Sequence, residues 1–307
     1  MIGFILAKKI LSLFMMMAMG AILVRTKVIR VEDSKSISII SLYLITPCAI
    51  FSAFQMKYTP QILKGLMLAA GAAFILHILM ILLTKILEKP MGLDVVEKTS
   101  MIYSNSGNLI IPIVTAIFGK EWVIYSTGYL SVQTILLWSH GRMMLCGEKN
   151  VDFRRVFMNI NILAVFAGVV CFILGFILPP PVLDAMDSVG AMIGPSAMIV
   201  TGMIIGSMDL KKLLSYRRLW FIGALRLVIY PLIGVAFLKF SGITGLVPEG
   251  VTILMITLLA MTTPSASTVT QMAQVYGKDS DYASAINVVT TLFCILTMPL
   301  MVTLYQI

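Results

Sequence analysis

A polar segment interrupts an otherwise apolar part of the chain at Tyr103-Ser104-Asn105-Ser106-Gly107-Asn108-Leu109-Ile110-Ile111-Pro112. Pro112 cannot donate a backbone hydrogen bond and Gly107 weakens a helix, so we expect the helix to break between them. The backbone groups freed by such a break need polar partners, because hydrocarbon offers none. The segment is therefore predicted to line a cavity inside the protein, near the middle of a membrane span.

A second polar segment surrounds Pro264. It holds more hydroxyl and amide side chains than a lipid-facing helix tolerates: Thr262, Thr263, Ser265, Ser267, Thr268, Thr270, Gln271 and Gln274. Two broken helices at corresponding places in a repeated protein predict a substrate site near the membrane midplane. The alternative is a pair of proline kinks whose freed carbonyls accept from neighbouring hydroxyls, with no ligand. We favour the site because the two segments form a matched pair.

The composition is typical of a chain that lies mostly within a bilayer. Of its 307 residues, 59% are hydrophobic and 12% are charged, and the mean hydropathy is +0.98. A spanning helix needs about 20 apolar residues, which leaves room for roughly ten spans and no sizeable soluble domain. We predict an all-α integral membrane protein with ten transmembrane helices at about residues 2–24, 36–54, 62–87, 98–118, 122–145, 156–178, 188–208, 219–240, 251–275 and 282–305.

Charge, cysteines and motifs argue against other classes of protein. The net charge is +9, but the basic residues form short clusters between apolar segments, which indicates membrane topology and no nucleic-acid partner. The four cysteines form no Cys-x-x-Cys pair, so neither a metal site nor a disulfide framework is predicted. No HExxH motif or nucleophile elbow occurs, so we expect no enzyme and no cofactor. The apolar start lacks a basic leader and a cleavage site, which predicts a first span.

The basic loops predict the orientation. Lysine and arginine are concentrated after the first, third, fifth and seventh predicted spans and are sparse in the other loops. Basic loops are retained in the cytoplasm. Both termini are therefore predicted on the extracytoplasmic side of the cell membrane.

Two short matches indicate an internal repeat. Residues 45–49 (Ile-Thr-Pro-Cys-Ala) resemble residues 193–197 (Ile-Gly-Pro-Ser-Ala), and residues 118–121 (Phe-Gly-Lys-Glu) resemble residues 276–279 (Tyr-Gly-Lys-Asp). We predict five-helix repeats over residues 1–150 and 151–307. An odd number of spans makes the second repeat enter the membrane from the opposite side, so the repeats are expected to be inverted. Chance recurrence of proline and glycine is the alternative.

The broken spans also predict the ligand and its contacts. The N-termini of half-helices present unpaired N–H groups and positive dipole ends, which suit an anion such as a carboxylate. The predicted substrate contacts are Asn105, Asn108, Thr263, Ser265, Ser267 and Gln271, with Gln133 facing the crossing. Arg226 lies deep in the eighth predicted span, where it either attracts the anion or extends to the cytoplasmic boundary. Since neither broken segment holds a carboxylate, a coupling cation would need hydroxyl and carbonyl oxygens.

The same residues resemble the auxin efflux carrier family of permeases. The resemblance rests on the ten-span layout, residues 105–112, Pro264 after two threonines, and Arg226 followed by Pro231, and it extends over essentially the whole chain. It implies two five-helix repeats that cross at Pro112 and Pro264, with a scaffold made mainly of the first, second, sixth and seventh spans. It also implies a small organic anion as substrate, because the family includes plant auxin exporters and bacterial carriers of malonate and malate.

We predict a secondary transporter that moves a small organic anion, a dicarboxylate or an auxin-like acid, by alternating access. A membrane sensor or receptor module that binds the ligand without moving it is the alternative. H⁺ and Na⁺ both remain open as coupling ions, and the direction of transport is open too. The Gly-x-x-x-Gly pairs at 190–194 and 202–206 predict close helix contact, either within the protomer or across a homodimer.

Overall fold

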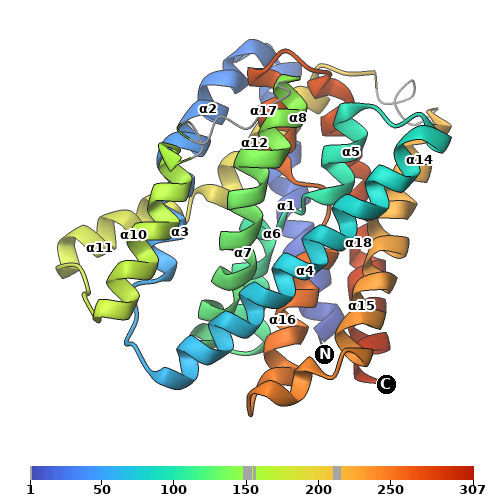
Figure 1. Cartoon of the computed structure of the whole chain (residues 1–307). Coiled ribbons are helices and arrows are strands. Elements are labelled where there is room, and N and C mark those ends of the chain that lie inside the picture. Colours follow the sequence, from blue (N-terminus) through green and yellow to red (C-terminus); the bar gives the residue numbers. More distant parts are fainter. Residues whose placement is uncertain (1, 148–153, 155–156, 210–215) are drawn as a thin grey trace.

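The computed structural model describes residues 2–147, 154, 157–209 and 216–307, and these residues form an assembly of helices (Figure 1). The first half contains α1 (Ile2–Arg25), η1 (Val31–Asp33), α2 (Ser34–Ile40), η2 (Ser41–Ile45), α3 (Thr46–Ala53), α4 (Pro60–Met91), α5 (Val95–Ile102), α6 (Ser106–Ile117), η3 (Lys120–Trp122), α7 (Val123–Leu136), η4 (Leu137–Gly141) and α8 (Arg142–Cys146). The second half contains α10 (Ile160–Leu174), α11 (Pro180–Gly190), α12 (Ile193–Gly206), α14 (Arg217–Ala224), η5 (Leu225–Ile229), α15 (Tyr230–Phe240), η6 (Ile243–Leu246), α16 (Gly250–Thr262), α17 (Ser267–Val275) and α18 (Ser280–Gln306).

Each of the ten predicted windows overlaps one or more of these helices. Five described segments are long and apolar enough to cross a membrane: Val31–Ala53, Pro60–Met91, Pro180–Gly206, Arg217–Phe240 and Ser280–Gln306. Shorter apolar helices occupy Leu11–Arg25, Ile160–Leu174 and Gly250–Thr262. The helical membrane class is thus confirmed for the described residues, while the number of spans stays a prediction.

Two helices widen into a π-helical turn just before a proline. A proline lacks the N–H of a regular helix and clashes with the carbonyl four residues earlier, and a wider turn accommodates it. η2 precedes Pro47, and there the Thr46 hydroxyl donates to the Ser41 carbonyl at 2.7 Å. η5 precedes Pro231 and contains Arg226, whose side chain is fully buried. This turn aims Arg226 at the centre of the protein.

Glycines let α12 approach α1 to backbone contact. A Cβ added at Gly202 would collide with the Met17 carbonyl, and one added at Gly206 would lie 2.7 Å from the Ala21 carbonyl. At the end of α11, a Cβ at Gly190 would lie 2.9 Å from the Ala49 Cα in α3. Small residues permit such close packing where lipid supplies no hydrophobic drive. The contact predicted for these glycines therefore lies within the protomer.

The helices form two groups around the broken segments. Figure 1 shows α2, α3, α10 and α11 on the left and α14, α15 and α18 on the right, while α4 runs diagonally from the lower left to the upper right and both termini lie at the same end of the molecule. The largest apolar cluster connects α1, α4, α6, α16 and α18 and contains residues such as Leu76, Ile110 and Leu258, all without exposed surface. The polar interruptions lie against this packed core.

Candidate functional site

Two helix breaks meet at the centre of the protein. The first separates α5 from α6 at residues 103–105, and the second separates α16 from α17 at residues 263–266. The two extended segments run antiparallel and form an isolated bridge between Ser104 and Ser265. The Asn105 N–H donates to the Pro264 carbonyl at 2.8 Å, and the Ala266 N–H donates to the Tyr103 carbonyl at 3.0 Å. These bonds join the broken helices.

The first break lies earlier than the sequence predicts. Pro112 falls inside α6, and Gly107 is the second residue of that helix, so the helix does not break between them. Pro264, in contrast, lies in the crossing segment. The break at residues 103–105 is stabilised because main-chain partners are available there, across the bridge and from neighbouring side chains. The position of the break therefore depends more on where hydrogen-bond partners are available than on where the proline lies.

Gln133 on α7 satisfies the main chain of Ser104. Its Oε1 accepts from the Ser104 N–H at 3.0 Å and from the Ser104 hydroxyl at 2.6 Å. Its Nε2 donates to the Ser104 carbonyl and to the Ser106 hydroxyl, both at 2.9 Å. The bridge leaves the N–H and the carbonyl of Ser104 pointing outward, where water cannot reach them. Gln133 is therefore a positioning residue of the crossing, and it also borders the cavity described below.

Asn287 and Thr290 on α18 do the same for Ser265. The Asn287 Nδ2 donates to the Ser265 carbonyl at 2.5 Å, and the Thr290 hydroxyl accepts from the Ser265 N–H at 3.1 Å. Both residues are fully buried. Sequence reasoning missed them, although Asn287 is an amide in an apolar window, which was the signal available. The crossing is thus supported alike from α7 and from α18.

Arg226 closes the C-terminal ends of both broken helices. Its guanidinium donates to the Met101 carbonyl in α5 at 3.0 Å and to the Met261 carbonyl in α16 at 2.8 Å. A further bond reaches the Thr263 carbonyl at 2.9 Å. The Met101 and Met261 carbonyls lie in the last turns of α5 and α16, where they have no partner within their own helices. The side chain is fully buried, so the interpretation that it extends to the membrane boundary is wrong.

A cavity of about 70 Å³ lies beside the crossing. A buried water needs about 10–15 Å³ of such space, so the cavity can hold several waters or a small ligand group. α6 and α17 both begin at its wall, and their first turns supply Asn105, Gly107, Ser267 and Thr268. The N-terminal ends of both half-helices therefore border it.

Four predicted contacts line this cavity, namely Asn105, Gln133, Ser267 and Gln271. The Ser267 hydroxyl donates to the Asn105 Oδ1 at 3.1 Å, which connects the two half-helices across the wall. The Gln271 side chain is 3% exposed, and its Nε2 has no hydrogen-bond partner. A buried donor without a partner is costly, so the Gln271 amide is available to a group that enters the cavity and accepts from it.

The remaining predicted residues lie elsewhere. Thr263 and Ser265 serve the crossing in this conformation: the Thr263 hydroxyl donates to the Ala260 carbonyl, and the main chain of Ser265 is bound by α18. Neither they nor Arg226 borders the cavity. Asn108 belongs to α6, but its side chain lies outside the described part of the structure.

The opposite wall comes from helices that sequence reasoning did not assign to the site. The helical run η2–α3 contributes Ser41 and Thr46, α12 contributes Ala197, and η4 contributes Trp138. The Ser41 hydroxyl donates to the Ser196 hydroxyl at 2.9 Å, which connects η2 to α12 at this wall. Isolated serine and threonine in apolar windows gave no usable signal. The cavity thus lies between the crossing and the neighbouring helix group.

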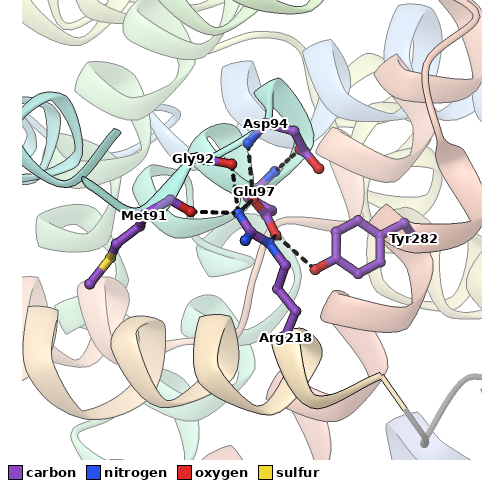
Figure 2. A network of polar contacts seen from close by, with 6 residues as sticks. All are labelled: Met91, Gly92, Asp94, Glu97, Arg218 and Tyr282. Atoms are coloured by element: carbon purple, nitrogen blue, oxygen red, sulfur yellow. Dashed lines mark hydrogen bonds and ion pairs between the residues drawn. The ribbon is translucent and has the colours of Figure 1, made fainter. Parts of the chain in front are cut away.

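A network of polar contacts lies at the start of α5 (Figure 2). Its residues Asp94, Glu97, Arg218 and Tyr282 line part of a second, open pocket of about 500 Å³. The Arg218 guanidinium forms an ion pair with the buried Glu97 carboxylate and donates to the Gly92 carbonyl at 2.8 Å. The Tyr282 hydroxyl donates to Glu97 at 2.9 Å. Burial raises the pKa of Glu97, but the hydrogen bonds from Arg218, from the Asp94 N–H and from Tyr282 outweigh it and leave that pKa below its usual value. The network holds α5, α14 and α18 together.

Among the described residues no group of three or more histidine, cysteine or acidic side chains forms a metal site.

Comparison with known proteins agrees with this architecture. The family model described as membrane transport protein matches the chain twice, over residues 5–155 and 148–302. The two matches confirm that the chain consists of two repeats. No curated protein matches the chain. Since the matches cover nearly all of its length, the chain belongs to the membrane transport protein family, as its resemblance to the auxin efflux carriers implied.

Proposed function

We propose that this transporter is a secondary carrier that moves a small organic anion by alternating access. The observation that carries the proposal is the cavity beside the crossing, where two half-helices begin and where Gln271 presents a buried amide donor without a partner. Such a wall suits an oxyanion, because amide, hydroxyl and backbone N–H groups all donate to it.

Helix dipoles add a positive potential at the same place. Each half-helix carries about half an elementary charge at either end, negative at the C-termini of α5 and α16 and positive at the N-termini of α6 and α17. Arg226 lies on the two C-termini and offsets them with its single positive charge. The two N-terminal ends remain uncompensated by any acidic side chain in the cavity wall among the described residues. Together they correspond to about one positive charge, which matches one carboxylate.

The cavity wall favours a monocarboxylate with an apolar body over a dicarboxylate. Among the described residues that line it there is no lysine, arginine or histidine, which a second carboxylate would need. Leu42, Ile50, Leu130 and Trp138 supply an apolar surface instead. An apolar group of the substrate would gain about 25 cal/mol for each Å² buried against these residues. A dicarboxylate remains the competing substrate.

The remaining features of the carrier are proposed from the sequence. We place ten spans as two inverted repeats over residues 1–150 and 151–307, with both termini outside the cytoplasm, because of the basic loops. H⁺ and Na⁺ are the two candidate coupling ions, and a homodimer is the candidate assembly.

Asn105 provides the test of the site. Its Asn105→Ala variant removes an amide from the cavity wall, and losing one charge-assisted bond costs about 1.5–3 kcal/mol, or roughly ten- to a hundredfold in affinity. Asn105→Asp places a carboxylate there and should repel an anion at nearly unchanged size. The measurements are binding isotherms and initial uptake of indole-3-acetate and of malonate into proteoliposomes.

Ile135→Ala on α7 is the matched control, since the Ile135 side chain is 41% exposed. Binding that is unchanged in both Asn105 variants, with both proteins folded, would remove the crossing as the site. Saturable binding without uptake would instead support the sensor module. Uptake of malonate in preference to indole-3-acetate would overturn the monocarboxylate assignment.

A further inference from the structure

An apolar groove runs between α14–η5 and α18, away from the crossing cavity. It encloses about 210 Å³ and is lined by Trp220, Gly223, Ala224, Leu227, Val228, Val289, Phe293 and Thr297. None of these residues lines the crossing cavity. The Trp220 and Phe293 rings meet edge to face, with centroids 5.5 Å apart. Every side chain of the wall except Thr297 is apolar or absent, so the groove suits a hydrocarbon chain.

Gly223 forms the floor of the groove. A Cβ built there would meet only the Val289 Cγ1 at 3.6 Å and the Thr290 Cγ2 at 3.9 Å, both ordinary contact distances. The glycine is therefore not required by backbone contact, unlike Gly202. Its missing side chain and the small Ala224 leave the space open. From Trp220 to Val228 the helix rises about 12 Å, close to the depth of one leaflet of a ~30 Å hydrocarbon core.

A basic residue lies at one end of the groove. Arg217 begins α14, is exposed, and lies one helical turn before Trp220 on the same face. Its neighbour Arg218 is engaged by Glu97, so Arg217 is the cation of this pair that faces outward. Tryptophan at such a position is typical of the boundary between headgroups and hydrocarbon. Arg217, Trp220 and the apolar groove thus lie in the same order as the phosphate, the glycerol and an acyl chain of a phospholipid.

We propose that this groove is a binding site for one anionic phospholipid, with its phosphate at Arg217 and an acyl chain along Gly223. The basic end of the molecule is the end predicted to face the anionic cytoplasmic leaflet, so charge and orientation agree. The proposal does not depend on which substrate the protein carries. It predicts a selectivity for anionic headgroups that a general lipid shell lacks.

Native mass spectrometry of the purified full-length protein with added phosphatidylglycerol or phosphatidylcholine tests the site. The wild-type protein should bind phosphatidylglycerol at least about fivefold more tightly, which corresponds to the ~1 kcal/mol that one basic residue contributes near an anionic surface. Arg217→Gln should bind the two lipids equally. Gly223→Leu should fill the groove and weaken both.

Gly71→Leu is the matched control, because Gly71 is an exposed glycine of α4 with no atom within 4 Å of an added Cβ. It should bind both lipids as the wild type does. Equal binding of the two lipids by the wild type, or unchanged selectivity in Arg217→Gln, would overturn the proposal even if Gly223→Leu did not fold. A dimer that dissociates in Gly223→Leu while lipid binding stays unchanged would assign the groove to a second copy of the chain instead.

Discussion

Replacing Arg226 is the most direct test of how the crossing is held together. Its guanidinium donates to carbonyls at the ends of α5 and α16, and the side chain has no exposed surface. Replacing Arg226 should therefore weaken folding itself, because the side chain holds two helix ends that have no other partner.

The magnitude follows from the three carbonyls. Arg226→Met leaves the carbonyls of Met101, Met261 and Thr263 buried without donors, and each such group costs about 1–3 kcal/mol. Loss of the charge also removes its interaction with two helix C-termini, worth about 0.3–1 kcal/mol each. We expect a loss of at least about 3–5 kcal/mol, the range found when one partner of a buried polar pair is removed. That is a large part of the 5–15 kcal/mol typical of a folded protein.

The order of variants separates charge from geometry. Arg226→Lys keeps the charge but lacks the planar fork that reaches both helix ends, so it should be intermediate. Arg226→Gln retains two amide donors on a shorter side chain and should lie between Lys and Met. Melting temperatures of the detergent-solubilised proteins should fall in this order, with a decrease on the order of 10 °C for Met.

Lys239→Gln is a suitable control, since Lys239 lies on the same helical run and is exposed. Substitutions of that kind usually change stability by less than about 0.5 kcal/mol. A melting temperature of Arg226→Met within about 2 °C of the wild type would refute the reasoning. If Arg226→Met also bound substrate normally, the C-terminal ends of α5 and α16 would not need the charge at all.

Two further predictions concern the supports of the crossing and the acidic network. Gln133→Leu leaves the N–H and the carbonyl of Ser104 without partners, so it should lower the free energy of unfolding by roughly 2–6 kcal/mol. Asn287→Leu leaves only the Ser265 carbonyl without its partner and should cost less, about 1–3 kcal/mol. Thermal melting of both variants checks this order, and a reversed order would contradict it. The pKa of Glu97 is lowered in the folded protein, so its contribution to stability is present at neutral pH and is lost as the pH falls below about 4. Glu97→Gln keeps an acceptor for Tyr282 but removes the charge, so its melting temperature should decline less than that of the wild type between pH 5 and pH 3, and parallel declines would argue against the ion pair.

Local composition predicted which polar segments are enclosed, because it reports where a helix cannot satisfy its own hydrogen bonds in hydrocarbon. The amides and hydroxyls around Asn105 and Ser267 had to be enclosed, and the structure encloses them at one cavity. The sequence placed the helix break too late, between Gly107 and Pro112. The effect of the proline could be estimated from the sequence, but the hydrogen bonds that stabilise the break across the bridge could not. Gln133 was correctly expected at the crossing, although its main role there is to bind Ser104.

The sequence by itself determined that this is a helical membrane protein, that it has a repeated organisation and that two polar regions face inward. These properties depend on runs of apolar residues and on their polar interruptions. The tertiary structure decided which groups meet. Arg226 binds the Met101 carbonyl, which lies 125 residues away in the sequence. The Ser265 carbonyl next to Pro264 is bound by Asn287, which comes from another helix, α18. Such pairings depend on how separate helices pack, and a hydrogen bond requires a fit within a few tenths of an ångström that no local pattern encodes.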